Sequence, residues 1–145
     1  MAPRTFLLVE DNPDDAEMAV LAFGKADLGI QIDHAVDGVE ALEYLLPPST
    51  AARATKGLPA AVLLDLKLPR VSGLQVLQRL RADPRTKLLP VVVLTSSSHP
   101  ADVVSSYDLG CNSYVRKPVD FARFLEVARY LGTYWLDVNE AAANP

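Results

Sequence analysis

Three carboxylates, a hydroxyl and an ammonium stand at the ends of apolar runs in this chain. Glu10 and Asp11 follow the first run, Asp65 follows another, Thr95 closes a third, and Lys117 comes after a fourth. Carboxylates held close together repel one another, and a hard divalent cation such as Mg²⁺ relieves that repulsion through oxygen ligands. An aspartate beside such a cation and a lysine can attack a phosphoryl group, because the cations neutralise charge on the transferring oxygens. These residues therefore predict phosphoryl transfer to a carboxylate, provided that the fold brings them together.

Each of these residues taken alone has a more ordinary role. A carboxylate after a strand is commonly solvated or caps a helix, a lone threonine commonly bonds the backbone, and a lone lysine commonly lies on the surface. Asp65 differs because it follows four apolar residues, so its charge lies close to dry packing and needs a reason. The coincidence of suitable residues at four separate strand ends favours a site over four unrelated roles.

The elements that must position these residues are short apolar runs that alternate with helical patterns. The runs predict strands at residues 5–10, 30–36, 60–65, 89–95 and 112–116. The first, third and fourth runs are continuously apolar, as in central strands covered on both faces, whereas Gln31, Asp33 and His34 place the second at an edge. Helix starts are indicated by Asn12-Pro13 and by two patterns typical of a capping box, at residues 37–40 and 72–75.

This alternation predicts an α/β fold, a doubly wound sheet of five parallel strands with helices on both faces. In such sheets ligands bind outside the carboxyl ends of the strands, which is where the candidate residues stand. The chain of 145 residues suits a single domain, and its net charge of −4 without a dense Lys/Arg block argues against nucleic-acid binding. No apolar run approaches the roughly 18 residues of a membrane span. Cys111 has no second cysteine to pair with, so we expect a soluble cytoplasmic protein.

Four motifs occur in the order and spacing of a known family: residues 7–12 (LLVEDN), 63–69 (LLDLKLP) with Gly73, 93–96 (VLTS) and 114–118 (YVRKP). On these motifs the chain resembles response regulator receiver domains, the phosphoacceptor modules of two-component signalling. The resemblance implies a flavodoxin-like sheet of strand order 2-1-3-4-5. It also implies one receiver domain over residues 1–145, with a core at about 5–131 and an extension at 132–145.

The resemblance also implies a role for each candidate residue. Asp65 would accept a phosphoryl group from a histidine of a sensor kinase. Glu10, Asp11, Asp65 and the backbone carbonyl of Lys67 would hold Mg²⁺, with Mn²⁺ as an alternative. Thr95, Ser96 and Lys117 would bind the phosphoryl group, Tyr114 would act as an aromatic switch, and the Lys117–Pro118 bond would be cis. The signal would leave through the surface of the fourth helix, the fifth strand and the fifth helix.

A narrower resemblance is to the single-domain response regulators of bacterial phytochromes. It is carried by residues 10–16 (EDNPDDA), the long loop at 47–59, residues 65–69 (DLKLP) and the ending at 131–136 (LGTYWL). It implies a phytochrome-type histidine kinase as the partner. Two positions depart from the commonest receiver pattern, since Glu10 replaces an aspartate and Lys67 stands two residues after the acceptor.

The last helical pattern is apolar over a wide arc. One stripe of residues at helical spacing is wide enough to dock on the sheet: Phe121, Phe124, Leu125, Ala128, Leu131 and Trp135. Val127, Tyr130 and Tyr134 extend the arc beyond that stripe, which predicts a symmetric homodimer through this helix. The alternative is that the tail of the chain folds back over these side chains.

Other functions of this fold class fit less well. An aspartyl-phosphate phosphatase using Asp65 would carry a second aspartate two positions on, where this chain has Lys67. A flavin or nucleotide carrier would need a glycine-rich phosphate loop after the first strand, where Glu10-Asp11 repel phosphate instead. A pseudo-receiver that works without phosphorylation is argued against by the complete set of candidate residues. The sequence thus favours a phosphoacceptor signalling protein rather than an enzyme.

Overall fold

A five-stranded parallel sheet lies between two layers of helices in the computed structural model, which describes residues 4–48 and 57–142. The strands are β1 (Thr5–Val9), β2 (Gln31–Ala35), β3 (Ala61–Leu64), β4 (Val91–Thr95) and β5 (Ser113–Arg116). Their order is β2-β1-β3-β4-β5, and all pairs are parallel. The predicted fold class and strand order are confirmed. The middle of the predicted long loop, 49–56, and the end of the tail, 143–145, lie outside the described residues.

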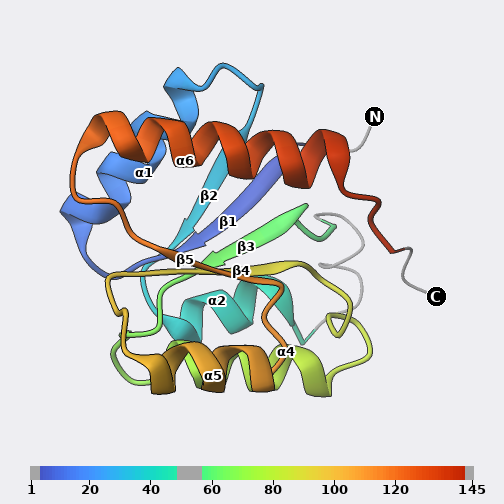
Figure 1. Cartoon of the computed structure of the whole chain (residues 1–145). Helices are drawn as coiled ribbons and strands as arrows, with labels where there is room; N and C mark the ends of the chain where they lie inside the picture. The colour runs from blue at the N-terminus through green and yellow to red at the C-terminus, as the bar shows by residue number, and fades with distance from the viewer. Residues whose placement is uncertain (1–3, 49–56, 143–145) are drawn as a thin grey trace.

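The helices of the described residues divide between the two faces of the sheet. They are α1 (Pro13–Lys25), α2 (Gly38–Leu45), α4 (Gly73–Ala82), α5 (Pro100–Asp108) and α6 (Phe121–Thr133). In Figure 1, α1 and α6 lie side by side on one face, and α2, α4 and α5 cover the other. The fourth and fifth helices of the sequence prediction are therefore α5 and α6.

The side chains of the central strands alternate between two separate apolar cores. Leu7, Val62 and Val93 point to the core under α2 and α4, while Leu8 and Leu63 point to the core under α1 and α6. All residues of β1, β3 and β4 are buried, as the continuous apolar runs predict, whereas β2 at the edge is partly exposed. Both faces of the central strands are thus packed against helices, which fixes the positions of the strand ends.

Polar caps set where the helices nearest the strand ends begin. The side chain of Asn12 accepts hydrogen bonds from the backbone N–H groups of Asp14 and Asp15, at 2.9 and 3.1 Å. Ser72 and Gln75 form the predicted capping box of α4, with reciprocal bonds of 3.2 and 2.8 Å. The caps fix the first turn of α1 and of α4 beside the loops that leave β1 and β3.

The loop that leaves β3 is folded back tightly at Gly73. The Gly73 N–H donates to the carbonyl of Leu66 at 2.9 Å, and a Cβ at this position would lie 2.2 Å from the carbonyl oxygen of Asp65. Only glycine allows this approach, because any side chain would displace the backbone of the residue that follows β3. Gly73 therefore fixes the turn that carries Asp65.

The position of Val127 corrects the prediction for the last helix. Val127 is only 8% exposed and packs in the core with Phe124 and Leu131, so it is not part of a free surface. The reason is its spacing: it stands three residues after Phe124 and four before Leu131, on the same helix face. Tyr130 and Tyr134 are exposed, as expected.

The helix α6 continues into one π-helical turn, η1 (Tyr134–Val138). An ion pair of 2.6 Å joins Asp137 in this turn to Arg4, the residue before β1. The buried Gly132 also packs closely against Leu28 of the loop before β2, since a Cβ on Gly132 would lie 2.6 Å from the Leu28 side chain. Within residues 4–48 and 57–142, no helix is both long enough and apolar enough to cross a membrane.

Candidate functional site

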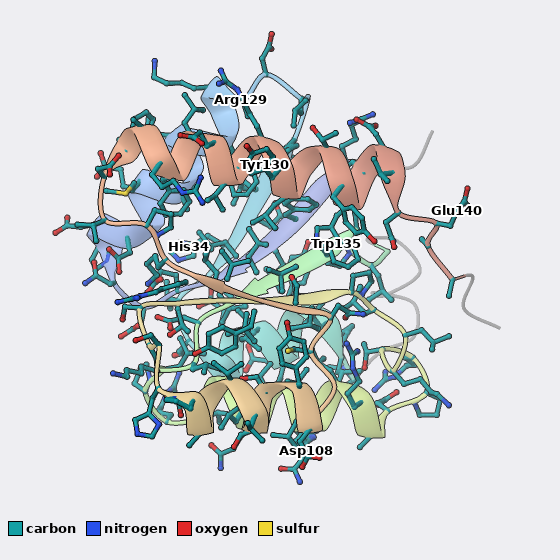
Figure 2. The ribbon with its side chains drawn as sticks, viewed as in Figure 1. His34, Asp108, Arg129, Tyr130, Trp135 and Glu140 are labelled. Atoms are coloured by element: carbon teal, nitrogen blue, oxygen red, sulfur yellow. The ribbon has the colours of Figure 1, made fainter. Side chains whose placement is uncertain are left out.

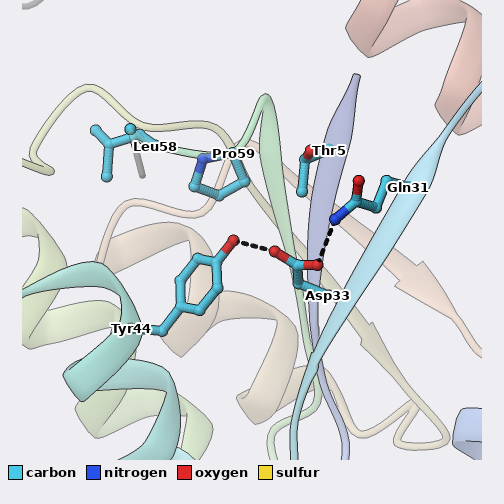
Figure 3. Close-up of a pocket in the computed structure, with 7 residues that line it drawn as sticks. Thr5, Gln31, Asp33, Tyr44, Leu58 and Pro59 are labelled. Atoms are coloured by element: carbon cyan, nitrogen blue, oxygen red, sulfur yellow. Dashed lines mark hydrogen bonds between the residues drawn. The ribbon is translucent and has the colours of Figure 1, made fainter. Parts of the chain in front are cut away.

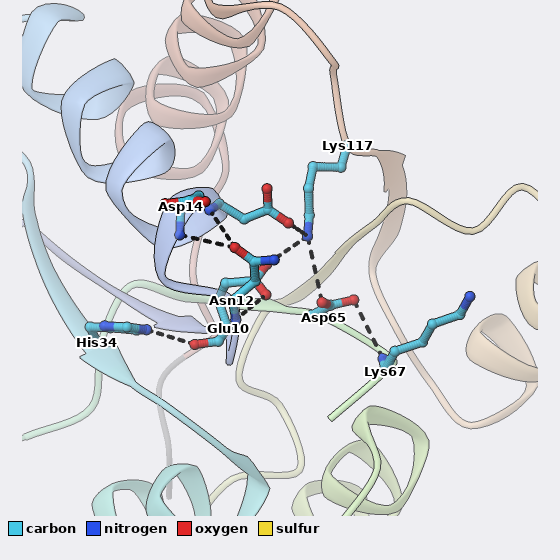
Figure 4. A network of polar contacts seen from close by, with 8 residues as sticks. Glu10, Asn12, Asp14, His34, Asp65, Lys67 and Lys117 are labelled. Carbon is cyan, nitrogen blue, oxygen red and sulfur yellow. Dashed lines mark hydrogen bonds and ion pairs between the residues drawn. The ribbon is translucent and has the colours of Figure 1, made fainter. Parts of the chain in front are cut away.

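The predicted acceptor, metal and phosphoryl-binding residues lie at the carboxyl ends of β1, β3, β4 and β5. Figure 4 shows Glu10, Asp65 and Lys117 together at this edge of the sheet. Backbone hydrogen bonds that continue the sheet hold three of them in place. The N–H of Glu10 donates to Ala35, that of Asp65 donates to Val9, and that of Lys117 donates to Thr95, at 3.0, 3.1 and 2.7 Å. The backbone of these three residues is therefore fixed by hydrogen bonds of the same kind that pair the strands of the sheet.

Three of these side chains form a cluster of oxygen atoms. One carboxylate oxygen from each of Glu10, Asp11 and Asp65 lies within 4.8 Å of the other two. Glu10 and Asp65 are buried, and Asp11 opens the cluster to solvent. A set made only of carboxylate oxygens is one that hard divalent cations such as Mg²⁺ and Mn²⁺ prefer. The residues present thus fit a divalent metal.

The surroundings of Glu10 support the same conclusion. Its carboxylate accepts hydrogen bonds from the Asn12 N–H at 3.1 Å and from the Lys117 ammonium at 2.6 Å. Burial nevertheless raises the pKa of Glu10, because it outweighs these two hydrogen bonds, and the neighbouring charge of Asp65 adds to the rise. The site therefore lacks positive charge for the carboxylates that it collects, which a cation would supply.

Among the described residues, Lys117 is the positively charged side chain that contacts this cluster of carboxylates. Its Nζ lies 2.6 Å from Glu10 Oε1, 3.0 Å from Asp15 Oδ2 and 3.5 Å from Asp65 Oδ2. Burial of the ammonium lowers the pKa of Lys117, but the bonds to Glu10 and Asp15 and the charge of Asp65 raise it overall. Lys117 therefore stays charged and lies directly beside the predicted acceptor carboxylate.

Asp15 was not among the residues predicted from the sequence. Its carboxylate contacts Lys117 across 102 positions of the chain, from the first turn of α1. The sequence offers one signal, the pair Asp14-Asp15 after the predicted cap Asn12, but two acidic residues there are equally favoured by the positive end of a helix. A pairing so distant in sequence is visible only in the folded chain.

The turn after β3 carries Asp65 and Lys67. The backbone N–H of Lys67 points to Asp65 Oδ1 at 3.4 Å, so the main chain of Lys67 borders the acceptor carboxylate. The Lys67 side chain is exposed and extends away from the cluster in Figure 4. The predicted acceptor and the predicted backbone ligand thus belong to one short turn.

Thr95 ends β4, which pairs with β3, the strand that leads into Asp65. Its side chain is fully buried, and its Oγ1 has no hydrogen-bond partner among residues 4–48 and 57–142. Burying a hydroxyl without a partner costs free energy, so an orphan of this kind calls for an explanation. A ligand oxygen at the strand ends would supply the missing partner. Ser96, the next predicted residue, is exposed.

Tyr114 lies on β5 with its ring half-buried against the core under α2 and α4. Its hydroxyl donates to the carbonyl of Ser97 at 2.8 Å, in the loop between β4 and α5. The Ser97 hydroxyl in turn donates to Asp102 at 2.5 Å, in the first turn of α5. The Tyr114 hydroxyl is thus hydrogen-bonded to the loop that follows Thr95.

The Lys117–Pro118 bond is trans, and the described residues contain no cis peptide bond. The prediction of a cis bond is therefore wrong for this structure. A trans bond before proline is favoured intrinsically by about 0.5–1 kcal/mol. The trans chain already brings the Lys117 ammonium to the carboxylates, because the Lys117 N–H is bonded to the end of β4.

The exposed tyrosines of α6 and η1 border a separate apolar groove. Tyr130 is 66% exposed and Tyr134 47%, and Tyr134 packs edge-on against Trp135, with ring centres 4.8 Å apart. Figure 2 places Tyr130 and Trp135 along the last helix, away from the strand ends that carry the carboxylates. The groove has a volume of about 360 Å³ and is lined by Asn112, Ser113, Tyr130, Leu131, Tyr134 and Trp135.

A further pocket of about 180 Å³ lies at the opposite end of the strands (Figure 3). Thr5 and Gln31, the first residues of β1 and β2, line it together with Asp33 and Tyr44. Tyr44 donates to Asp33 at 2.5 Å, and burial, followed by this bond, raises the pKa of Tyr44. The pocket is remote from the carboxylate cluster.

Comparison with known proteins identifies the same region as a family domain. The family described as response regulator receiver domain matches residues 6–129. Response regulator Rcp1 of Synechocystis sp. is 30% identical over 135 residues, 93% of this chain and 90% of Rcp1. The crystal structure of its Mn²⁺-bound form superposes with a TM-score of 0.84 at 29% identity, over 97% of this chain and all of the other.

Two further solved structures are described as phytochrome response regulators. The phosphorylated cyanobacterial phytochrome response regulator RcpA is 31% identical and has a TM-score of 0.88, over 98% of this chain and 100% of RcpA. The bacteriophytochrome response regulator AtBRR is 43% identical and has a TM-score of 0.76, with both chains fully covered. The narrower resemblance predicted from the motifs is therefore reflected in these neighbours.

Proposed function

Because this chain belongs to the response regulator receiver domain family, we propose that it is a single-domain response regulator phosphorylated on Asp65. A histidine of a sensor kinase supplies the phosphoryl group. A carboxylate oxygen of Asp65 attacks phosphorus, the new P–O bond forms as the P–N bond breaks, and the electron pair returns to the imidazole. Residues 1–145 act as one receiver domain in the cytoplasm, with residues 132–145 as its extension.

The observation that carries this proposal is the unpaired hydroxyl of Thr95. It is fully buried at the strand end beside β3, and a phosphoryl oxygen on Asp65 gives it an acceptor. Lys117 supports a second oxygen of the group, since its ammonium already lies 3.5 Å from Asp65 Oδ2. Ser96, one residue beyond, contributes at the exposed rim of the site. These donors stabilise the charge of the transferring oxygens.

A divalent cation, Mg²⁺ with Mn²⁺ as an alternative, completes the site when it is bound. Glu10, Asp11, Asp65 and the backbone carbonyl of Lys67 would hold it, and it supplies positive charge that screens the incoming phosphoryl group. The oxygen cluster and the raised pKa of Glu10 support this part of the proposal. The protein catalyses its own phosphorylation and dephosphorylation and turns over no other substrate.

The proposed partner is a phytochrome-type histidine kinase. The support is the 43% identity to AtBRR over the full length of both chains, together with the similarity to RcpA. The proposed output is a shift of the Thr95 and Tyr114 side chains that alters the surface of α5, β5 and α6. The Tyr114 hydroxyl, bonded to the loop after Thr95, gives that shift a direct route to α5.

We also propose that the chain forms a symmetric homodimer through α6. Tyr130 and Tyr134 are exposed beside an apolar groove on this helix, and two copies would cover both tyrosines. Val127 does not belong to this surface, because it is buried in the core of its own chain. The competing explanation is that the tail of the chain covers the groove.

Phosphotransfer from radiolabelled kinase in the presence of Mg²⁺ tests the proposed function. We expect the wild-type protein to gain acid-labile label and Asp65→Asn to gain none, with an unchanged far-UV circular dichroism spectrum. Asp108→Asn, at the exposed end of α5, is the matched control and should be labelled normally. Acid-labile phosphate retained on Asp65→Asn would rule out Asp65 as the acceptor.

A further inference from the structure

Asp15 contacts the reactive lysine without belonging to the metal cluster. The oxygens that gather for a cation come from Glu10, Asp11 and Asp65, whereas Asp15 reaches Lys117 from the first turn of α1. Lys117 thus contacts two carboxylates that a cation would take up and one that it would not. Of the three described partners of the Lys117 ammonium, Asp15 is therefore the one that can still bind it when a cation occupies Glu10 and Asp65.

The three contacts match the three donors of an ammonium group. Two are hydrogen bonds, to Glu10 at 2.6 Å and to Asp15 at 3.0 Å, and the third is the longer approach to Asp65 at 3.5 Å. A cation bound to Glu10 weakens the hold of that carboxylate on Lys117, because both positive groups compete for the same charge. Without Asp15, no carboxylate outside the metal cluster would then hold the Lys117 ammonium near Asp65.

We infer that Asp15 is a positioning residue, which holds the Lys117 ammonium over Asp65 while a divalent cation occupies Glu10 and Asp11. This inference rests on the proposed phosphorylation of Asp65. Among the described residues, the Asp15 carboxylate bonds Lys117 and stands outside the oxygen cluster, so it acts through Lys117. The Asp15 side chain is 39% exposed, so packing does little to hold it. Its contact with Lys117, which is only 9% exposed, is what fixes its position.

The simpler explanation is that Asp15 only stabilises the start of α1. Asp14 provides the matched control, because it lies in the same helical turn and its N–H bonds the same Asn12 oxygen. Both residues place negative charge near the positive end of the helix, but the structure shows a bond to Lys117 for Asp15 alone. Asp14→Asn therefore reproduces the loss of charge and leaves the lysine contact intact.

The first measurement is the ¹⁵N-detected ammonium signal of Lys117 in metal-free protein, identified by its absence from Lys117→Arg. We expect the protection of its protons from exchange to fall by roughly threefold or more in Asp15→Asn and to stay unchanged in Asp14→Asn. Asp15→Glu, which keeps a carboxylate, should restore part of the protection. Equal protection in Asp15→Asn and Asp14→Asn would overturn the inference.

The second measurement is the affinity for beryllofluoride, a phosphoryl mimic, at saturating Mg²⁺. Loss of negative charge alone strengthens anion binding, so a structural role predicts equal or tighter binding in both variants. We expect Asp15→Asn to bind roughly three- to tenfold more weakly than Asp14→Asn. Equal affinities would also overturn the inference. If the wild type binds no beryllofluoride, the proposed function fails, and the ammonium measurement alone decides the role of Asp15.

Discussion

Lys117 and Glu10 form a buried ion pair, with Nζ 2.6 Å from Oε1 and side chains only 9% and 4% exposed. The pair brings the end of β1 against the loop after β5, across 107 positions of the chain. It also sets up a competition, because Glu10 lies in the oxygen cluster that would hold a cation. Lys117 and a bound cation would thus share the Glu10 carboxylate.

Lys117→Ala should destabilise the metal-free protein by about 3–5 kcal/mol, since it leaves the Glu10 charge buried without its partner. Added Mg²⁺ should recover more stability in this variant than in the wild type, because no ammonium then competes for Glu10. Urea denaturation with and without Mg²⁺ measures both effects. Lys87→Ala, at an exposed position, is the control and should match the wild type. Equal Mg²⁺ stabilisation of Lys117→Ala and wild type would argue against the shared carboxylate.

Thr95→Val should separate stability from ligand binding. The substitution removes a buried hydroxyl that has no partner, so the free energy of unfolding should stay equal or rise by up to about 1 kcal/mol. The affinity for beryllofluoride with Mg²⁺ should fall, because one donor to the phosphoryl mimic is lost.

Thr86→Val is the matched control for this effect on stability. Thr86 is equally buried, but its hydroxyl donates to the carbonyl of Leu80 at 2.7 Å. Its replacement should cost about 1–3 kcal/mol, because the carbonyl loses its partner. If Thr95→Val destabilised the protein as much as Thr86→Val, the Thr95 hydroxyl would have a partner within the folded chain.

Asp37→Asn should lower stability in a pH-dependent manner. The N–H of Glu40 and the guanidinium of Arg70 hold the pKa of Asp37 below its ordinary value. A lowered pKa contributes stability that is present above the unfolded pKa of about 4 and is lost as the pH falls through the folded value. Asparagine still caps α2, so the variant removes the charge and keeps the cap.

Urea denaturation of both proteins between pH 7 and pH 2.5 measures this effect. The wild type should be more stable than Asp37→Asn at pH 7, and the difference should shrink as the pH falls below the ordinary aspartate value. A difference that stays constant over this range would show that the Asp37 charge contributes nothing through Arg70.

Tyr130→Asp should reduce the mass of the protein in solution if α6 forms the dimer interface. The tyrosine is 66% exposed and borders the groove, so a charge there would be buried in the dimer but solvated in the monomer. Sedimentation at micromolar concentration measures the change. Leu21→Asp, a 50% exposed apolar position on α1, is the matched control and should leave the mass unchanged. A Tyr130→Asp protein of unchanged mass would exclude this interface.

The sequence was most informative where one local rule decides the structure. Continuous apolar runs located the buried strands, and the residues after them located the candidate site. It was least informative where a contact joins distant segments, as between Asp15 and Lys117. Val127 shows a further limit. Helical spacing identifies which residues form an apolar arc, but it does not show how wide a part of that arc the core covers. In this structure the core extends to Val127. The cis bond at Pro118 was implied by resemblance alone, and the observed chain reaches the site without it.

The two cores of this domain lie on opposite faces of one sheet. Tyr114 packs against the core under α2 and α4, while its neighbour Val115 packs against the core that α6 covers. The backbone of β5, an edge strand of four residues, therefore lies between the ring of Tyr114 and the helix of the proposed dimer. Substitutions on the exposed face of α6 can therefore change how copies associate while the packing around Tyr114 stays as it is, because the two lie in different cores.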